Sequence, residues 1–357
     1  MLNMISEFTD YFDAFKLRFG RKNKELNNAY ASDELKNTFE NDIKPQLKSI
    51  ELNRESLHAK FIKRKRQLNF VILPIAALLT IFALFAGEDG SFLYIIPVSF
   101  CIGTGWAYKP ALDYVRHYKL KVMPILVKMY GDFTYSLKSN LQANDIKNLA
   151  IAPNFDYLKT EDCVTGKIDD IGFEFTELTL HKRSKNGSNR VFKGCLVLLT
   201  MPFNFNSLTL VKHDHGKVLN WLTKDNKVTE KVALENVDFE NKFEVYSNDQ
   251  VLARYILTPV MMEQLLSLLY AFVMKVNATQ LEYEFVGNKA VFFIRHTENL
   301  LEPTWIDQSA FEINALPLIE QELALLISIA KQLNLDLMAA RRVSKENNLD
   351  SKSEYRS

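Results

Sequence analysis

The chain has 357 residues, and its 44 lysines and arginines nearly balance its 43 aspartates and glutamates. This length allows two or three domains. Residues 1–69 carry 14 cationic side chains against 10 acidic ones, residues 109–149 carry 7 against 3, and residues 150–357 carry 23 against 28. A nucleic-acid-binding domain needs a concentrated basic face, so the acidic balance of the largest segment argues against a nucleic-acid partner.

The first 67 residues are predicted to form a helical cytoplasmic arm. Apolar residues recur there at spacings of three and four, as in the series Leu35, Phe39, Ile43 and Leu47. A narrow apolar stripe of this kind favours helix pairing, which leaves two interpretations open. The arm either joins copies of the chain by self-association or packs back on the C-terminal part of its own chain.

Two uncharged apolar stretches, residues 70–86 and 92–108, follow the arm and are separated by the short acidic linker 87–91. Each has about 17 apolar or small residues, which is near the lower limit for a helix that spans a bilayer. The alternative is a buried helical hairpin in a soluble core, but such helices usually carry charge on one face. We therefore predict a two-helix transmembrane hairpin over residues 68–108.

Basic residues flank this hairpin on both sides, whereas the linker between the helices has none. The cations before it are Lys60, Lys63, Arg64, Lys65 and Arg66, and those after it are Lys109, Arg116, Lys119 and Lys121. Cationic loops stay on the cytoplasmic side of a membrane. The pattern predicts a multi-pass inner-membrane protein with both termini in the cytoplasm and the lipid bilayer as its first partner.

Residues 109–149 are predicted to continue as a juxtamembrane helix, and the sequence changes in character from about residue 150. Strand-like runs cover residues 164–168, 171–180, 190–201, 207–212, 281–285 and 290–295. Asn186-Gly187 and Gly287-Asn288 are turn pairs that predict two β-hairpins. One helix is predicted to start at Thr258-Pro259, and a second is predicted over residues 316–333.

Strands, a helix, a hairpin and another helix do not alternate as they do in a parallel α/β fold. We therefore predict a membrane-anchored α+β protein, in which residues 150–340 form a cytoplasmic antiparallel or mixed β-sheet domain with two helices. Residues 341–357 are polar and are predicted to be a disordered tail.

No group of residues indicates a cofactor or metal site or a set of catalytic residues. His213-Asp214-His215 has the spacing of a metal chelate, but no third ligand is identifiable nearby, and a surface loop is the favoured interpretation. Cys101, Cys163 and Cys195 show neither disulfide nor ligand spacing, which suits a reducing compartment. The acidic neighbours of Cys163 would raise its pKa, so we assign it a structural role.

A basic hairpin tip is the first candidate binding element. Lys182, Arg183, Lys185 and Arg190 surround the predicted Asn186-Gly187 turn. On a membrane-tethered domain such a cluster can bind anionic lipid. The alternative is a solvated loop, because loop tips are often charged.

The second candidate comes from a family resemblance. The segment at 243–259, with Tyr246, Ser247, Asp249, Ala253 and Arg254 before Thr258-Pro259, resembles a signature of the bacterial membrane-protein family known as domain of unknown function 3137. Val191-Phe192-Lys193-Gly194 and the order of arm, membrane helices and C-terminal domain are also similar to that family. The resemblance implies a bacterial inner-membrane protein but implies no activity and no residue roles.

We interpret the chain as a non-enzymatic scaffold that presents its cytoplasmic domain to a protein or to anionic lipid. The alternative hypothesis is an enzyme at the membrane surface with Tyr246, Asp249 and Arg254 near its site. That alternative requires the three side chains to converge in one pocket with another titratable group.

Overall fold

The computed structural model describes residues 33–85, 95–185, 187–213, 230–311, 316, 319–329 and 331. The chain folds into two compact units. The helical unit comprises residues 1–126 and 302–320, and the sheet unit comprises residues 127–301 and 321–357. The chain thus leaves the sheet unit after residue 301, contributes residues 302–320 to the helical unit and then returns to the sheet unit.

The first described part of the helical unit is one long helix over Asp33–Phe85, and its stretch Leu35–Phe85 is a candidate membrane span. Its successive segments are α2 (Asp33–Thr38), the π-helical turn η2 (Phe39–Ile43), α3 (Lys44–Gln67), the π-helical turn η3 (Leu68–Ile72) and α4 (Leu73–Phe85). Each π-helical turn lies just before a proline, Pro45 or Pro74. Proline lacks a backbone N–H and clashes with the carbonyl four residues earlier, so a wider turn at that point lets the helix continue.

This helix is the one described helix that is long and apolar enough to cross a membrane by itself. The consecutive helices α8 (Gln250–Ile256) and α9 (Pro259–Val276) meet the same criterion only when they are counted as one span broken by a bend of 64°. The inward face of α9 is buried, including Leu265, Leu269 and Phe272, as expected for a core helix of the sheet unit.

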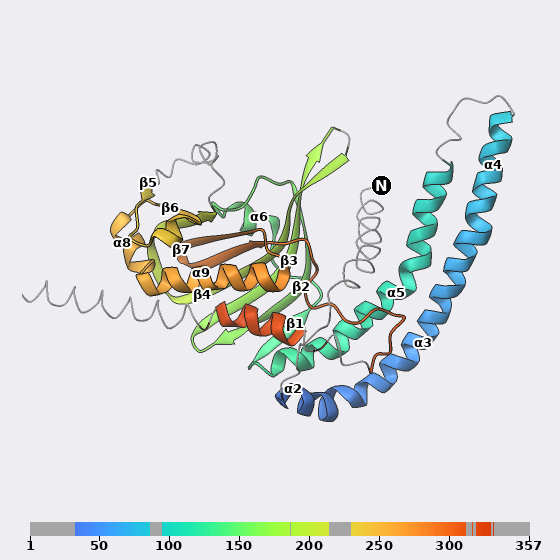
Figure 1. Cartoon of the computed structure of the whole chain (residues 1–357), viewed down its shortest axis with the longest axis horizontal. Helices are drawn as coiled ribbons and strands as arrows, with labels where there is room; N and C mark the ends of the chain where they lie inside the picture. Colours follow the sequence, from blue (N-terminus) through green and yellow to red (C-terminus); the bar gives the residue numbers. More distant parts are fainter. Residues whose placement is uncertain are drawn as a thin grey trace, which may run out of the picture. The chain divides into compact units, whose positions relative to one another are not determined.

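The second long helix of this unit is α5 (Ile95–Lys128), and an extended strap, residues 302–311, binds to both long helices (Figure 1). Lys119 of α5 forms a buried ion pair with Glu302 at 2.6 Å. Arg54 of α3 donates a hydrogen bond to Ile306 O at 2.7 Å, and Ala310 N donates to Glu51 Oε2 at 2.7 Å. The strap therefore joins α3 to α5.

The structure corrects the predicted helix over residues 109–149. α5 ends at Lys128, and residues 133–136 form an edge strand of the sheet unit. Gly131 lies between them with φ +131°, a value that L-residues rarely adopt. In the sequence, apolar residues continue at helical spacing through this region. In the structure, the helix ends before Gly131 and the chain continues as an extended strand.

The sheet unit contains a seven-stranded antiparallel sheet (Figure 1). Its strands are β1 (Phe133–Ser136), β2 (Tyr157–Ile168), β3 (Ile171–Ser184), β4 (Gly187–His213), β5 (Glu230–Val232), β6 (Phe243–Ser247) and β7 (Gln280–Arg295). They follow the order β1-β2-β3-β4-β6-β5, and β7 pairs with β4. This sheet confirms the predicted α+β class.

β7 turns back on itself at Gly287, where φ is +56°. Thr279 N, at one end of β7, donates a hydrogen bond to Arg295 O at 2.8 Å. A straight strand of this length would separate those ends by about 50 Å. The fold-back agrees with the hairpin predicted from Gly287-Asn288, and the β3–β4 connection agrees with the hairpin predicted from Asn186-Gly187.

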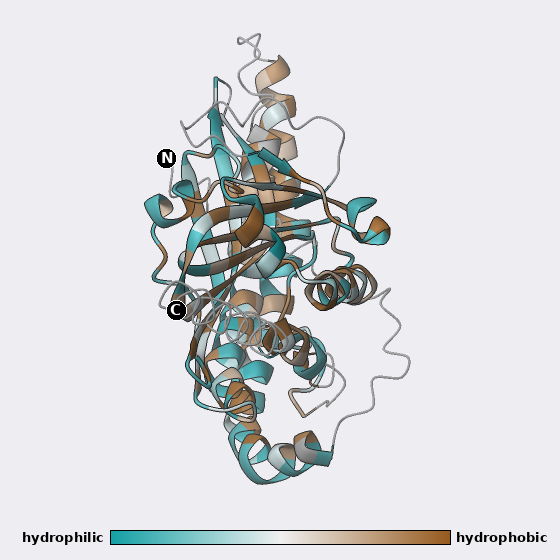
Figure 2. Cartoon of the chain, turned by 90° about the vertical axis from the view of Figure 1, so that its left-hand side faces the viewer, coloured by the Kyte–Doolittle hydropathy of each residue, from teal (hydrophilic) through white to brown (hydrophobic). Residues whose placement is uncertain are grey.

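The two faces of the sheet bury separate layers of apolar side chains. On one face, Leu180, Leu210 and Phe293 pack with Ile151 and Phe155 from the segment that follows the helix α6 (Ala143–Lys147). The other face is covered by α9, and the Tyr283 hydroxyl donates to Leu265 O at 3.4 Å. Figure 2 shows the apolar residues of these strands in brown.

Candidate functional site

The β3–β4 hairpin extends beyond the rest of the sheet as a two-stranded ribbon (Figure 1). β2 pairs with β3 only as far as Tyr157 opposite His181, whereas β3 and β4 remain paired to Ser184 opposite Gly187. We call residues 181–185 and 187–190 the basic tip. Lys182, Arg183, Lys185 and Arg190 are all exposed there, and these residues include no aspartate or glutamate.

Contacts from β2 and the residue before it hold the base of the basic tip in place. The Tyr157 ring stacks on His181 with 4.8 Å between centroids, and its hydroxyl donates to Ser188 Oγ at 2.6 Å. Arg183 N donates to Asp156 Oδ2 at 2.6 Å. Because the ribbon is fixed at its base, the four cations are presented on an ordered scaffold.

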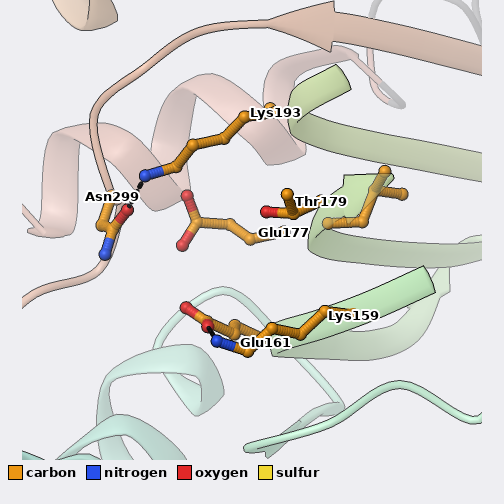
Figure 3. A pocket seen from close by; sticks show the side chains of 8 residues that line it. Lys159, Glu161, Glu177, Thr179, Lys193 and Asn299 are labelled. Carbon is orange, nitrogen blue, oxygen red and sulfur yellow. Dashed lines mark hydrogen bonds and ion pairs between the residues drawn. The ribbon is translucent and has the colours of Figure 1, made fainter. Parts of the chain in front are cut away.

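A shallow pocket of about 210 Å³, open solvent included, is lined by β2, β3, β4 and the segment that follows β7 (Figure 3). Lys193 Nζ donates to Asn299 Oδ1 at 2.6 Å, and Lys159 pairs with Glu161 at 2.8 Å. Glu177 is buried between these pairs and accepts a hydrogen bond from Leu300 N at 2.9 Å. The pocket thus gathers two ammonium groups and two carboxylates.

The dimensions and charge of this pocket argue for a structural role. Small-molecule sites usually enclose about 300–1,000 Å³, whereas the enclosed part of this pocket is about 10 Å³, which is room for about one water molecule. The bond from Leu300 N and the contact of Lys193 with Asn299 fasten the chain after β7 onto β3 and β4. The charged side chains therefore hold two neighbouring residues of one segment in place.

Tyr246, Asp249 and Arg254 have separate partners. The Tyr246 ring belongs to the apolar core, and its hydroxyl donates to Glu244 Oε2 at 3.0 Å. Asp249 caps α8, because its Oδ1 accepts hydrogen bonds from Val251 N and Leu252 N at 3.0 Å each.

Arg254 is exposed and donates to Gln250 O at 3.3 Å and to Ala233 O at 3.4 Å. In the part of the chain that the structure describes, each of these three side chains thus bonds to different partners, and none of these bonds joins two of the three. The enzyme site at this signature stays a prediction.

A buried charged group that sequence reasoning missed lies between β4 and β7. Burial lowers the pKa of the Lys212 ammonium, and the nearby Glu282 and Glu284 act in the opposite direction. Glu284 Oε2 accepts a hydrogen bond from Ile151 N at 3.0 Å, which fastens the covering segment to the sheet. The alternation of β7 predicted one acidic face, but only the fold shows that this face is turned inward.

The cysteines and histidines fit structural roles. Burial, and secondly the Glu174 carboxylate, raises the pKa of Cys163 to about 12. Burial, and secondly the Glu177 carboxylate, also raises the pKa of Cys195 well above its usual value. The described residues include no group of three potential metal ligands. His213 ends β4, whereas Asp214 and His215 lie outside the described residues, so the predicted loop is untested there.

Comparison with known proteins gives one family match. Residues 190–335 match the model of a family described as "Protein of unknown function (DUF3137)". This match confirms the resemblance drawn from residues 243–259 and from Val191-Phe192-Lys193-Gly194. The bacterial origin and the inner-membrane location that the resemblance implies remain predictions.

No curated protein matches the chain. A solved structure, described as the crystal structure of the mycobacterial trehalose monomycolate transport factor A, TtfA, is similar at 14% identity. The similarity covers 59% of this chain and 93% of that chain with a TM-score of 0.31. A TM-score of this size supports no conclusion about fold or function.

Proposed function

We propose a function from the geometry, because the family whose model residues 190–335 match is described only as a protein of unknown function. The chain is a non-enzymatic inner-membrane scaffold, anchored by a two-helix hairpin. It presents the sheet unit in the cytoplasm to a protein partner or to anionic lipid. Self-association through the N-terminal arm stays part of this proposal, and residues 1–32 of the arm lie outside the described residues.

The observation that carries the proposal is the apolar exterior of α4. Leu78, Phe82 and Phe85 are 66%, 74% and 88% exposed, and Ile75, Leu79 and Leu84 of α4 and Phe70 of the preceding η3 are also exposed. Figure 2 shows this part of the helix in brown. A soluble protein rarely exposes a continuous apolar surface of this size, whereas a helix surrounded by lipid must do so.

Contacts within the helical unit support a second membrane helix beside the first. Arg64, at the end of α3, donates to Trp106 O at 3.0 Å and lies 5.0 Å from the Trp106 ring. Gly103 of α5 packs against Leu68, so that an added Cβ would overlap its side chain. Trp and Arg are typical of membrane interfaces, and small residues are typical of closely packed membrane helices.

The first turns of α5 also expose apolar side chains. Ile96, Val98, Phe100 and Ile102 are exposed, like the residues of α4. In the sequence, the two apolar segments separate the basic residues of α3 and α5 from the linker 87–91. This distribution supports an arrangement in which α3 and the second half of α5 are cytoplasmic.

Membrane insertion can be tested by placing charge on α4. We expect Leu78→Arg combined with Phe82→Arg to move the full chain out of the membrane fraction in flotation and alkaline extraction. An arginine near the centre of a spanning helix costs about 2.5–3.5 kcal/mol on insertion scales. Leu52→Arg is the matched control, because Leu52 is an exposed apolar residue of α3 outside the proposed span.

Topology and partners need separate measurements. A reporter that works only in the cytoplasm is expected to be active when it is fused after Ser357. A reporter that works only in the periplasm is expected to be active when it is inserted in the linker 87–91. Crosslinking in intact membranes is expected to recover a partner of the sheet unit. Periplasmic activity after Ser357 would overturn the anchor, and recovery of the chain alone with no lipid preference would overturn the scaffold role.

A further inference from the structure

We propose that the basic tip docks on anionic lipid headgroups of the same bilayer that anchors the chain. The inference rests on the proposed membrane anchor and adds the contact surface and the lipid class. The binding groups are the side chains of Lys182, Arg183, Lys185 and Arg190. Their partners are the phosphates of anionic phospholipids such as phosphatidylglycerol.

The charge of the tip is available for an external partner. Among the described ion pairs, none involves these four side chains. Asp156 is the acidic residue bonded to the tip, and it accepts from the backbone nitrogen of Arg183 and not from its guanidinium. Each cation near an anionic membrane surface changes the partition coefficient about five-fold, so four together give on the order of several hundred-fold.

The position of these cations also orients the sheet unit by repulsion. The sheet unit, residues 127–301 and 321–357, carries 26 cationic and 26 acidic side chains, so its remainder has four more acidic than cationic side chains once the four tip cations are left out. An anionic surface therefore repels this remainder and attracts the ribbon that projects from it. The net effect favours an approach with the tip first, at distances within the Debye length of about 8 Å at physiological salt.

The connection to the membrane removes the need for high affinity. The proposed span of α5 ends near Tyr108, and about 20 further helical residues, roughly 30 Å of helix, lead to Lys128 and then to β1 at Phe133. Attachment to the bilayer over this distance gives an effective local concentration on the order of millimolar, so a weak contact is populated. The stacking of Tyr157 on His181 further reduces the ordering cost, because the ribbon base is already held in place.

A fluid lipid surface fits these groups better than an acidic protein does. Four exposed side chains on a narrow ribbon provide much less area than the roughly 800 Å² that each partner contributes to a stable protein interface. The tip has no pocket or apolar anchor among its described residues that would select one protein. Headgroup phosphates require only cations that can reach them, and arginine and lysine both bind phosphate.

The test uses the full chain in nanodiscs of neutral phosphatidylcholine, or of phosphatidylcholine with phosphatidylglycerol. A donor dye on Ser184→Cys reports the distance of the tip from an acceptor dye on lipid headgroups. We expect energy transfer to rise in the anionic discs and to fall again at high salt. A dye on Asp170→Cys, at the opposite end of β3, is expected to respond little because about 40 Å of strand separates the two sites.

Two matched variants separate tip charge from net charge. The tip variant changes Lys182, Arg183, Lys185 and Arg190 to Gln and should lose the lipid-dependent rise. The control variant changes the exposed Lys138, Lys167, Lys242 and Lys289 to Gln, removes the same net charge and should retain the rise. The proposal would be overturned if the unmodified tip gave equal energy transfer in both disc types. It would also be overturned if the tip variant and the control variant lost the lipid-dependent rise equally. Failure of the chain to enter discs would instead overturn the anchor itself.

Discussion

Gly194 is the position at which a single methyl group should damage the sheet most. The structure places Gly194 opposite Arg295 in the ladder between β4 and β7. A Cβ added to Gly194 would overlap Ile294 O and lie 2.9 Å from the Ile294 carbonyl carbon and 3.0 Å from Arg295 Cα. All three are backbone atoms, so no side-chain rotation relieves the contact and the two strands must separate.

The cost of Gly194→Ala follows from this forced separation. Overpacking a buried position costs about 1–3 kcal/mol, and each ladder hydrogen bond that is weakened adds about 1 kcal/mol. With two such bonds affected, we expect a loss of about 3–5 kcal/mol. In a domain of about 200 residues, 1 kcal/mol corresponds to roughly 2–4 °C, so the expected drop in Tm is about 6–20 °C.

Thermal unfolding of the full chain, followed by circular dichroism in detergent, measures this drop. Gly172→Ala is the matched control in the neighbouring strand β3. Its added Cβ would lie 3.2 Å from Cβ of Thr200, an exposed residue that can shift, so the change should stay within about 1 kcal/mol. If Gly194→Ala unfolds at the same temperature as Gly172→Ala, the argument from close backbone approach is refuted.

Three further predictions concern Asp249, Lys119 and Cys163. Asp249→Ala should cost about 1 kcal/mol of unfolding free energy by removing the cap of α8, whereas Asp249→Asn should cost much less. Lys119→Met should cost about 3–5 kcal/mol because Glu302 is left buried without its cation, and Lys119→Met with Glu302→Met should recover most of that loss in the same melting assay. Cys163, whose pKa is raised to about 12, should resist iodoacetamide at pH 8.5 until the chain is unfolded, as mass spectrometry would show. Above about pH 9 the unfolded chain releases the Cys163 thiol proton, whereas the folded chain keeps it up to about pH 12. The free energy of unfolding should therefore fall as pH rises from about 9 to about 12.

Local signals in the sequence predicted the elements that depend on local chemistry. Thr258-Pro259 predicted the start of α9, and the Thr258 hydroxyl does accept a hydrogen bond from Met261 N at 3.2 Å. The Gly287-Asn288 pair predicted the fold-back of β7. In both cases the deciding interaction lies within a few residues, so neighbouring residue types suffice to indicate it.

Interactions between distant segments were not predictable in this way. The strap residues Glu302 and Ile306 contact Lys119 and Arg54, which are far away in the chain, and no periodicity marks them. The pocket at Glu177 likewise combines β2, β3, β4 and the residues after β7. The edge strand β1 was missed because its four residues follow a helix whose apolar spacing continues past Gly131.

The family signature acquires a physical meaning from these contacts. Gly194 permits the close approach of β7, Asp249 caps α8, and the Tyr246 ring fills the core. Each of these residues specifies backbone geometry or packing in this chain. The signature residues are therefore explained here by the fold and not by a binding site.

The basic tip differs from the signature in this respect, since its cations support neither the core nor a turn. Three of them, Lys182, Arg183 and Lys185, precede residue 190, where the family match begins. Replacing them should leave the melting temperature almost unchanged, because exposed positions typically contribute less than about 0.5 kcal/mol. A variant without the tip charge should therefore fold normally, and lipid composition is the variable that tests the proposed docking of the tip.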